Sequence, residues 1–166
     1  MRVLEVWSGG QTGVDRAALD VAQELGLAIG GWVPLGRLSE DGRVPDEYQG
    51  LRETTSPEYG QRTSLNVQDS DATLILFRDE LAGGSAFTLD EALRLGRPCM
   101  GLTLDSPYPG AAVRNVQTWI AGLPGSRLNV AGPRATSDPG IYALARVFLH
   151  AVLQPGGSGA AQHPGR

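Results

Sequence analysis

A glycine-rich segment near the start of the chain carries the strongest chemical signal in the sequence. Residues 8–16 read SGGQTGVDR and join a strand-like run, 2–7, to a segment with helical periodicity. The first amides of a helix lack intrahelical partners and carry partial positive charge, and glycine lets an anion approach the backbone closely. The segment therefore predicts a phosphate-binding turn. Its candidate residues are Ser8, Gly9, Gly10, Gln11, Thr12, Gly13, Asp15 and Arg16.

The same segment has a simpler interpretation. It fits neither the G-x-G-x-x-G dinucleotide pattern nor the G-x-x-x-x-G-K-[ST] phosphate loop. A tight turn between strand and helix, with Asp15 favourably placed near the positive end of the helix dipole, explains the residues without a ligand. Both interpretations stay open from the sequence.

A second glycine turn has the same relation to its neighbours. Residues 83–91 read GGSAFTLDE and follow the apolar run 72–77, which is typical of a central parallel strand. Paired glycines with hydroxyl side chains make a concave anion site, although Ser85 as a helix N-cap is the alternative. Parallel strands end at one edge of a sheet, so we expect the two turns to lie close together. The candidates here are Gly83, Gly84, Ser85 and Thr88.

Four further side chains are candidate ligand contacts. Arg62 and Asn66 lie four residues apart in the polar helical segment 57–70, so they share a helix face and suit a phosphate or ribose. A solvated surface is the alternative for this pair. Arg37 follows the second strand-like run as another candidate cation, and Trp32 at the end of that run could stack on a base or belong to the core.

Candidate catalytic groups are few. No Ser/His/Asp or Cys/His arrangement stands out, so catalysis would depend on carboxylates and arginine; Glu91 is the best-placed acid and Asp15 the second. The single cysteine, Cys99, excludes an intramolecular disulfide. With only two histidines, His150 and His163, we predict no metal site.

The elements that must position these residues alternate between strand and helix about five times. This pattern predicts an α/β, Rossmann-like three-layer sandwich, with a mostly parallel sheet and helices on both faces. We expect one domain over 1–153, a long functional loop or lid at 34–56, and a mobile tail at 154–166. The expected strands are 2–7, 27–33, 72–77, 98–104 and 128–131, and the expected helices are 14–25, 57–70, 85–95, 113–123 and 141–152.

Composition narrows the function classes. The 166 residues carry 14 cationic side chains against 18 acidic ones, for a net charge of −4. An acidic chain lacks the basic face that nucleic-acid binding requires. All 14 cations are arginine, so an anion must be held by guanidinium or backbone N–H groups. No signal peptide or membrane-spanning stretch is visible, and we expect a soluble cytoplasmic protein.

Four segments in order, 8–20, 30–45, 53–75 and 83–98, resemble the molybdenum carrier family, and the likeness runs from about residue 3 to 150. That family is close to the molybdenum-cofactor carrier proteins. It belongs to a Rossmann-like superfamily shared with the LOG phosphoribohydrolases and DNA-processing protein A. The resemblance implies a sheet of five to seven strands, homo-oligomers (dimer or tetramer), and a nucleotide or molybdopterin-type ligand at the two glycine turns.

The hydrolases of that superfamily carry P-G-G-x-G-T-x-x-E. Here Ala82 replaces the proline, the glycine of the second block is missing, and one extra residue separates Gly84 from Thr88, although Thr88 and Glu91 keep the T-x-x-E spacing. The departure puts hydrolase activity in doubt. The sequence favours a carrier for a phosphate-bearing, nucleotide-like ligand, with molybdenum cofactor as one candidate. A nucleoside monophosphate phosphoribohydrolase and a nucleotide-sensing signalling module stay open as alternatives.

Overall fold

The protein folds around a six-stranded parallel sheet. The computed structural model describes residues 1–105 and 110–154, and the strands lie in the order β5-β2-β1-β8-β6-β7. Their bounds are Glu5–Trp7 (β1), Ala28–Val33 (β2), Leu51–Glu53 (β5), Ala72–Phe77 (β6), Cys99–Thr103 (β7) and Arg127–Ala131 (β8). A separate antiparallel pair, Leu38–Ser39 (β3) and Gly42–Arg43 (β4), follows the single-turn 3-10 helix Leu35–Arg37.

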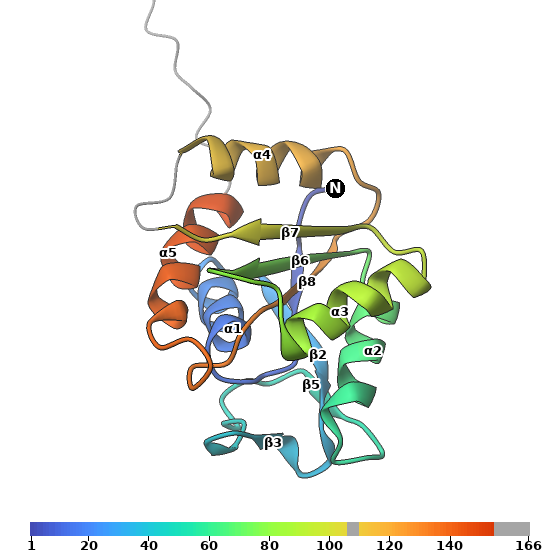
Figure 1. Ribbon diagram of the computed structural model, residues 1–166. Helices are drawn as coiled ribbons and strands as arrows, with labels where there is room; N and C mark the ends of the chain where they lie inside the picture. The colour runs from blue at the N-terminus through green and yellow to red at the C-terminus, as the bar shows by residue number, and fades with distance from the viewer. Residues whose placement is uncertain (106–109, 155–166) are drawn as a thin grey trace, which may run out of the picture.

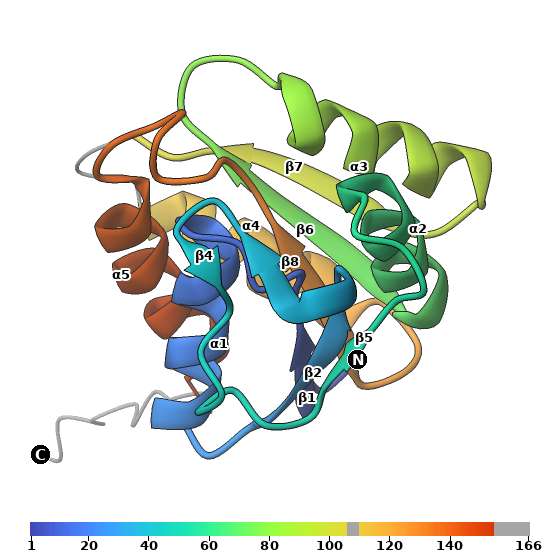
Figure 2. The ribbon, with the colours of Figure 1, turned by 90° about the horizontal axis from the view of Figure 1, so that it is seen from below.

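Helices cover both faces of the sheet (Figures 1 and 2). One face carries α1 (Val14–Glu24), α4 (Gly110–Ala121) and α5 (Ile141–Leu153), and the other carries α2 (Tyr59–Asp69) and α3 (Gly83–Arg94). The predicted α/β, Rossmann-like three-layer architecture is therefore confirmed. The apolar positions spaced three and four apart in α1 and α5 explain why these two helices pack tightly on the sheet and on each other.

The two faces differ in polarity. The α1/α4/α5 face is a continuous apolar core built on Val6, Leu74, Leu76, Leu128 and Val130 of the central strands. The opposite face carries buried polar side chains on the same strands. There Asn129 of β8 lies in register with Thr73 of β6 and donates to its hydroxyl at 3.2 Å. Buried polar groups require hydrogen-bond partners, so this face of the sheet is suited to polar contacts as well as to apolar packing.

The order of the strands places the site. From β1 the chain proceeds to β2 on one side, and from β6 it proceeds to β7 on the other. Strand β8, which is followed in the described chain only by α5, lies between β1 and β6. Ligands of open parallel sheets bind at such a divergence, beyond the carboxyl ends of the strands.

The sequence missed strand β5 and the β3–β4 pair, which all lie in the segment predicted to be a long loop at 34–56. Apart from Gln154, the predicted tail lies outside the described residues, and so does His163. Within the described residues, no helix is long and apolar enough to cross a membrane.

Candidate functional site

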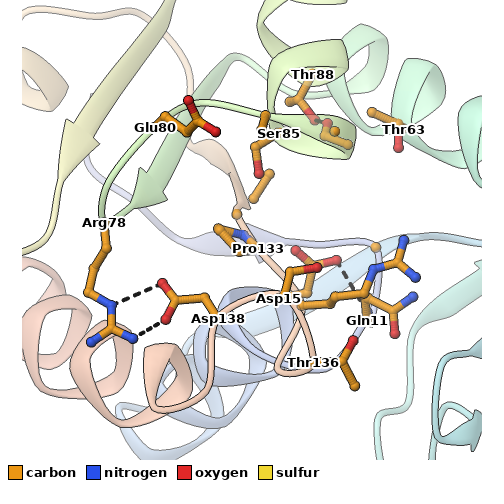
Figure 3. A pocket seen from close by; sticks show the side chains of 18 of the residues that line it. Gln11, Asp15, Thr63, Arg78, Glu80, Ser85, Thr88, Pro133, Thr136 and Asp138 are labelled. Carbon is orange, nitrogen blue, oxygen red and sulfur yellow. Dashed lines mark hydrogen bonds and ion pairs between the residues drawn. The ribbon is translucent and has the colours of Figure 1, made fainter.

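A cavity of about 1080 Å³ opens at the carboxyl ends of β1, β6 and β8. Its walls come from the turn after β1, the start of α3, one face of α2, and the loop after β8 (Figure 3). The two predicted glycine turns thus contribute to one cavity. They are not adjacent, because β8 and its loop lie between them.

The first glycine turn is largely satisfied by the protein itself. The amide of Gly10 donates to the Ser8 hydroxyl at 3.1 Å, and the amide of Gln11 donates to Asp15 Oδ2 at 3.2 Å. The next amide, of Thr12, donates to Gln11 Oε1 at 3.1 Å. These donors already have acceptors, so they offer little to an anion.

The glycines of this turn make room for other parts of the chain. A Cβ at Gly9 would lie 1.7 Å from Nη1 of Arg62, and one at Gly13 would lie 2.3 Å from the carbonyl oxygen of Pro133. Arg62 crosses the turn, and the loop after β8 packs on it through the bond from the Val14 amide to the Pro133 carbonyl, 3.3 Å long. Close backbone approach is therefore used within the protein.

The structure brings the predicted residue Arg62 to the wall of the cavity. Its Nη1 donates to the Gly9 carbonyl at 2.7 Å and pairs with Asp15 Oδ2 at 3.2 Å, while Nε donates to the Tyr59 carbonyl at 3.3 Å. Its Nη2 has no hydrogen-bond acceptor among residues 1–105 and 110–154. A fixed guanidinium with one free edge at a cavity is suited to an anionic oxygen.

Asp15 is the buried partner of Arg62. Burial raises the pKa of this carboxyl above its ordinary value, and the charge of Arg62 opposes the rise. The carboxylate also lines the cavity, where Figure 3 shows it beside Gln11. The pair of Arg62 and Asp15 leaves this wall close to neutral.

The second glycine turn is open. Gly83 and Gly84 begin α3, and a Cβ at either position would meet nothing within 4 Å. Their amides have no acceptor among the described residues, and the N-cap Ala82 has no capping side chain. Ser85 and Thr88 line the cavity next to them (Figure 3). The free amides and partial positive charge of a helix start face the cavity here, as an anion site requires.

The loop after β8 was not predicted as part of the site. It supplies Pro133, Arg134, Thr136 and Asp138 to the lining, to which Asn129 in the middle of β8 also belongs. Two signals in the sequence could have revealed it. An asparagine interrupts the strand RLNVA, and a Gly/Pro/Ser-rich segment follows that strand as other segments follow β1 and β6.

Several predicted residues hold the fold around the site. Asn66 Oδ1 accepts from the Trp32 amide at 2.8 Å and Asn66 Nδ2 donates to the Trp32 carbonyl at 2.9 Å, so both ends of its amide are used although it lines the cavity. Arg16 pairs with Asp41 at 2.6 Å, and Arg37 donates to carbonyl groups of 44–48. Arg16, Arg37 and Trp32 are not among the cavity-lining residues.

Glu91 lies outside the cavity lining, on the third turn of α3. Arg94 binds both of its oxygens, at 2.9 and 2.8 Å. Hydrogen bonds from Arg94 and Ser64 lower the pKa of Glu91 to about 2, so it is ionised at neutral pH. A paired, ionised carboxylate away from the cavity is poorly placed to donate a proton. Among the described residues, no group of three or more His, Cys, Asp or Glu side chains is placed to hold a metal ion.

Comparison with known families agrees with this architecture. The family model described as "Circularly permutated YpsA SLOG family" matches residues 6–153. The chain belongs to this family. A solved structure from Syntrophus aciditrophicus SB, named "Putative molybdenum carrier protein", is similar to this SLOG protein, with 43% identity and a TM-score of 0.88. The alignment covers 92% of this chain and 96% of that one. No curated protein matches at a significant level.

The expected likeness to the molybdenum carrier proteins is therefore confirmed. This SLOG protein is molybdenum-carrier-like in sequence and Rossmann-like in fold. The circular permutation in the family description concerns the order of elements along the chain. In this chain, β8 enters the centre of the sheet only after β6 and β7, between β1 and β6.

Proposed function

We propose that this SLOG protein is a binding or carrier protein for a small ligand that bears one phosphate group and a nucleotide-like or pterin-like body. The phosphate lies at the start of α3 and the body extends along the loop after β8. The observation that carries the proposal is the open helix start: Gly83 and Gly84 have free amides at the wall of a large cavity.

Charge at the cavity limits the ligand class. The lining contains four carboxylates, Asp15, Asp79, Glu80 and Asp138, against three guanidiniums, Arg62, Arg78 and Arg134. A triphosphate needs a clear surplus of positive charge, and this cavity has none. One phosphate group at the backbone amides of α3, with the free edge of Arg62 as a further donor in the same cavity, matches the available donors. The phosphate ester of molybdopterin and that of a nucleoside monophosphate both fit this description.

The same geometry favours holding a ligand over cleaving it. The acid that a LOG-like phosphoribohydrolase would use, Glu91, is paired with Arg94 and lies outside the cavity lining. Asp15 is the cavity carboxylate with a raised pKa, but Arg62 occupies one of its oxygens. The name of the similar solved structure also supports a carrier role.

A charge exchange at Gly84 tests the phosphate site. Position 84 faces open space and its φ is not in the left-handed region, so Gly84→Glu is tolerated, and an acid at a helix start favours the helix. The matched control, Gly84→Gln, has the same shape without the charge. We expect Gly84→Glu to weaken binding at least tenfold more than Gly84→Gln, as measured by calorimetry with phosphate, nucleoside monophosphates and molybdopterin.

Two results would contradict the proposal. One is that no phosphate-bearing compound binds, including whatever native mass spectrometry finds in the purified protein. The other is that Gly84→Glu and Gly84→Gln bind equally well. Base release from AMP that Glu91→Gln abolishes would support the hydrolase instead. A cytoplasmic location and a homo-oligomer, dimer or tetramer, stay predictions, and light scattering with and without ligand tests the second and the signalling alternative.

A further inference from the structure

The side-chain amide of Gln11 has a fixed orientation. Its Oε1 accepts from the Thr12 amide at 3.1 Å and from the Glu40 amide at 2.9 Å. Rotating the amide by half a turn would set its –NH2 group against two N–H donors, so the oxygen must occupy this position. Gln11 Nε2 is therefore the end that is left for another partner.

Gln11 Nε2 is a buried donor without an acceptor among the described residues. Gln11 is only 5% exposed, yet its side chain lines the cavity. Buried side-chain donors in native proteins nearly always have an acceptor, and an unpaired one at a cavity indicates an absent partner. An acceptor on a ligand in the cavity would satisfy this donor.

Asp15 lines the same cavity and binds the same turn, and it carries the complementary group. Asp15 Oδ2 accepts from the backbone N–H of Gln11 and from Arg62 Nη1, both at 3.2 Å, which fixes the Asp15 carboxylate against the turn that carries Gln11. Asp15 Oδ1 has no hydrogen-bond donor within residues 1–105 and 110–154. Besides the free edge of Arg62, this wall of the cavity therefore has an unpaired donor, Gln11 Nε2, and an unpaired acceptor, Asp15 Oδ1, among the described residues.

From this pair we propose that Gln11 and Asp15 read a hydroxyl group of the ligand. A hydroxyl accepts from Gln11 Nε2 and donates to Asp15 Oδ1 at once, whereas a carbonyl satisfies only Gln11 and an ammonium group only Asp15. Figure 3 shows Gln11 and Asp15 across the cavity from Ser85 and Thr88 at the start of α3. The inference rests on the proposed phosphate site, and together the two sites select a phosphorylated sugar, such as the ribose 5′-phosphate of a ribonucleotide.

The test compares ligands that differ by one hydroxyl. The four ribonucleoside 5′-monophosphates and ribose 5-phosphate are titrated by calorimetry beside their 2′-deoxy and 3′-deoxy counterparts. We expect the hydroxylated form to bind at least tenfold more tightly than the analogue that lacks the recognised group. Equal affinities for the three forms would overturn the inference and leave the phosphate site standing. This ratio of affinities is measured on the wild-type protein, so misfolding of a variant cannot affect it.

The variant Gln11→Glu then tests whether Gln11 is the residue that recognises the hydroxyl group. It keeps the acceptor for the Thr12 and Glu40 amides and replaces the donor with a second oxygen. The added carboxylate lowers the affinity for both phosphorylated forms, so the readout is their ratio: we expect the preference for the hydroxylated form to fall to near one. The control, Gln23→Glu, makes the same exchange on the exposed face of α1 and should preserve the preference.

The remaining outcomes separate the two proposals. An undiminished preference in Gln11→Glu would overturn the role of Gln11. Binding of inorganic phosphate with none of the sugar phosphates would overturn the reading of a sugar hydroxyl and leave the phosphate site intact. No binding of any phosphate compound would instead contradict the proposed function, and the inference with it.

Discussion

The two glycine turns of this SLOG protein resemble each other in sequence and differ in what surrounds them. In the turn after β1, the amides of Gly10, Gln11 and Thr12 donate to the protein's own oxygens. The missing side chain of Gly9 leaves space for Arg62. In the turn that begins α3, Gly83 and Gly84 face open space. Glycine in a strand-to-helix turn therefore indicates close approach, but the approaching group can be a ligand or another part of the chain.

The sharpest way to break this comparison is to add one methyl group to each turn. Gly9→Ala places a Cβ 1.7 Å from Arg62 Nη1, so the guanidinium must leave the Gly9 carbonyl and the buried Asp15. Loss of a partner from a buried ion pair costs about 3 kcal/mol or more. We expect the free energy of unfolding in urea to fall by about that amount.

Gly84→Ala is the matched control. Its Cβ meets nothing within 4 Å, and alanine in a helix is favoured over glycine by roughly 0.5–1 kcal/mol. We expect stability to be unchanged or slightly higher. Equal destabilisation by the two variants would show that the turns do not differ as described.

Much of this architecture could be predicted from the sequence because it depends on local patterns. Apolar periodicity located the main helices, and the runs 72–77 and 128–131 located central strands. Strand β5 is only three residues long and pairs with β2 through the backbone, so its side chains give no pattern. Both glycine turns were found, but their different surroundings depend on contacts with Arg62 and Pro133, which are distant in sequence.

The position of β8 in the sheet was the most important feature that the sequence did not predict. Strand order is set by packing across the whole chain, so the sequence did not show that the loop 131–139 would lie between the two turns. The same limit applies to single side chains. Asn66 and Arg62 share a helix face as predicted. Among the described residues, Arg62 keeps a nitrogen without an acceptor, whereas both the oxygen and the nitrogen of the Asn66 amide bind the backbone of Trp32.

Replacing Arg62 with lysine sharpens the comparison by weakening the group that occupies the first turn. Lysine keeps the charge but cannot serve Gly9, Tyr59 and Asp15 with separate fixed donors. We expect Arg62→Lys to lower stability by about 1–3 kcal/mol and to weaken phosphate binding by roughly tenfold. Arg16→Lys, outside the cavity lining, should leave binding unchanged, as measured by calorimetry and urea unfolding.

The pKa values of the carboxyl groups near the two turns should be shifted in opposite directions. Burial raises the folded-state pKa of Asp15, so the unfolded chain ionises first and this group's contribution to stability falls as pH rises from about 3.8 towards the folded-state value. Arg94 and Ser64 lower the pKa of Glu91 to about 2, so its contribution is lost as pH falls from 4.5 towards 2. NMR titration of the two side-chain carboxyls should give these two signs.

Asp15→Asn and Glu91→Gln assign the effects. Each should remove its own contribution from the pH dependence of unfolding and leave the other in place. An ordinary pKa for Asp15 would mean that burial at the first turn does not outweigh the charge of Arg62. That result would contradict the closed character assigned to the turn after β1.

The smallest effect is expected at a second ion pair across the cavity from Arg62. Arg78 binds both oxygens of Asp138 and so joins the loop after β6 to the loop after β8 (Figure 3). Its side chain is 36% exposed, whereas that of Arg62 is 10% exposed. Exposed pairs contribute about 0–1 kcal/mol and weaken with salt. We expect Arg78→Gln to cost less than about 1 kcal/mol, with a smaller difference at 1 M salt, while the cost of Arg62→Lys persists. A large, salt-independent loss at Arg78 would mean that the loop after β8 depends on this bond more than on its packing against the first turn.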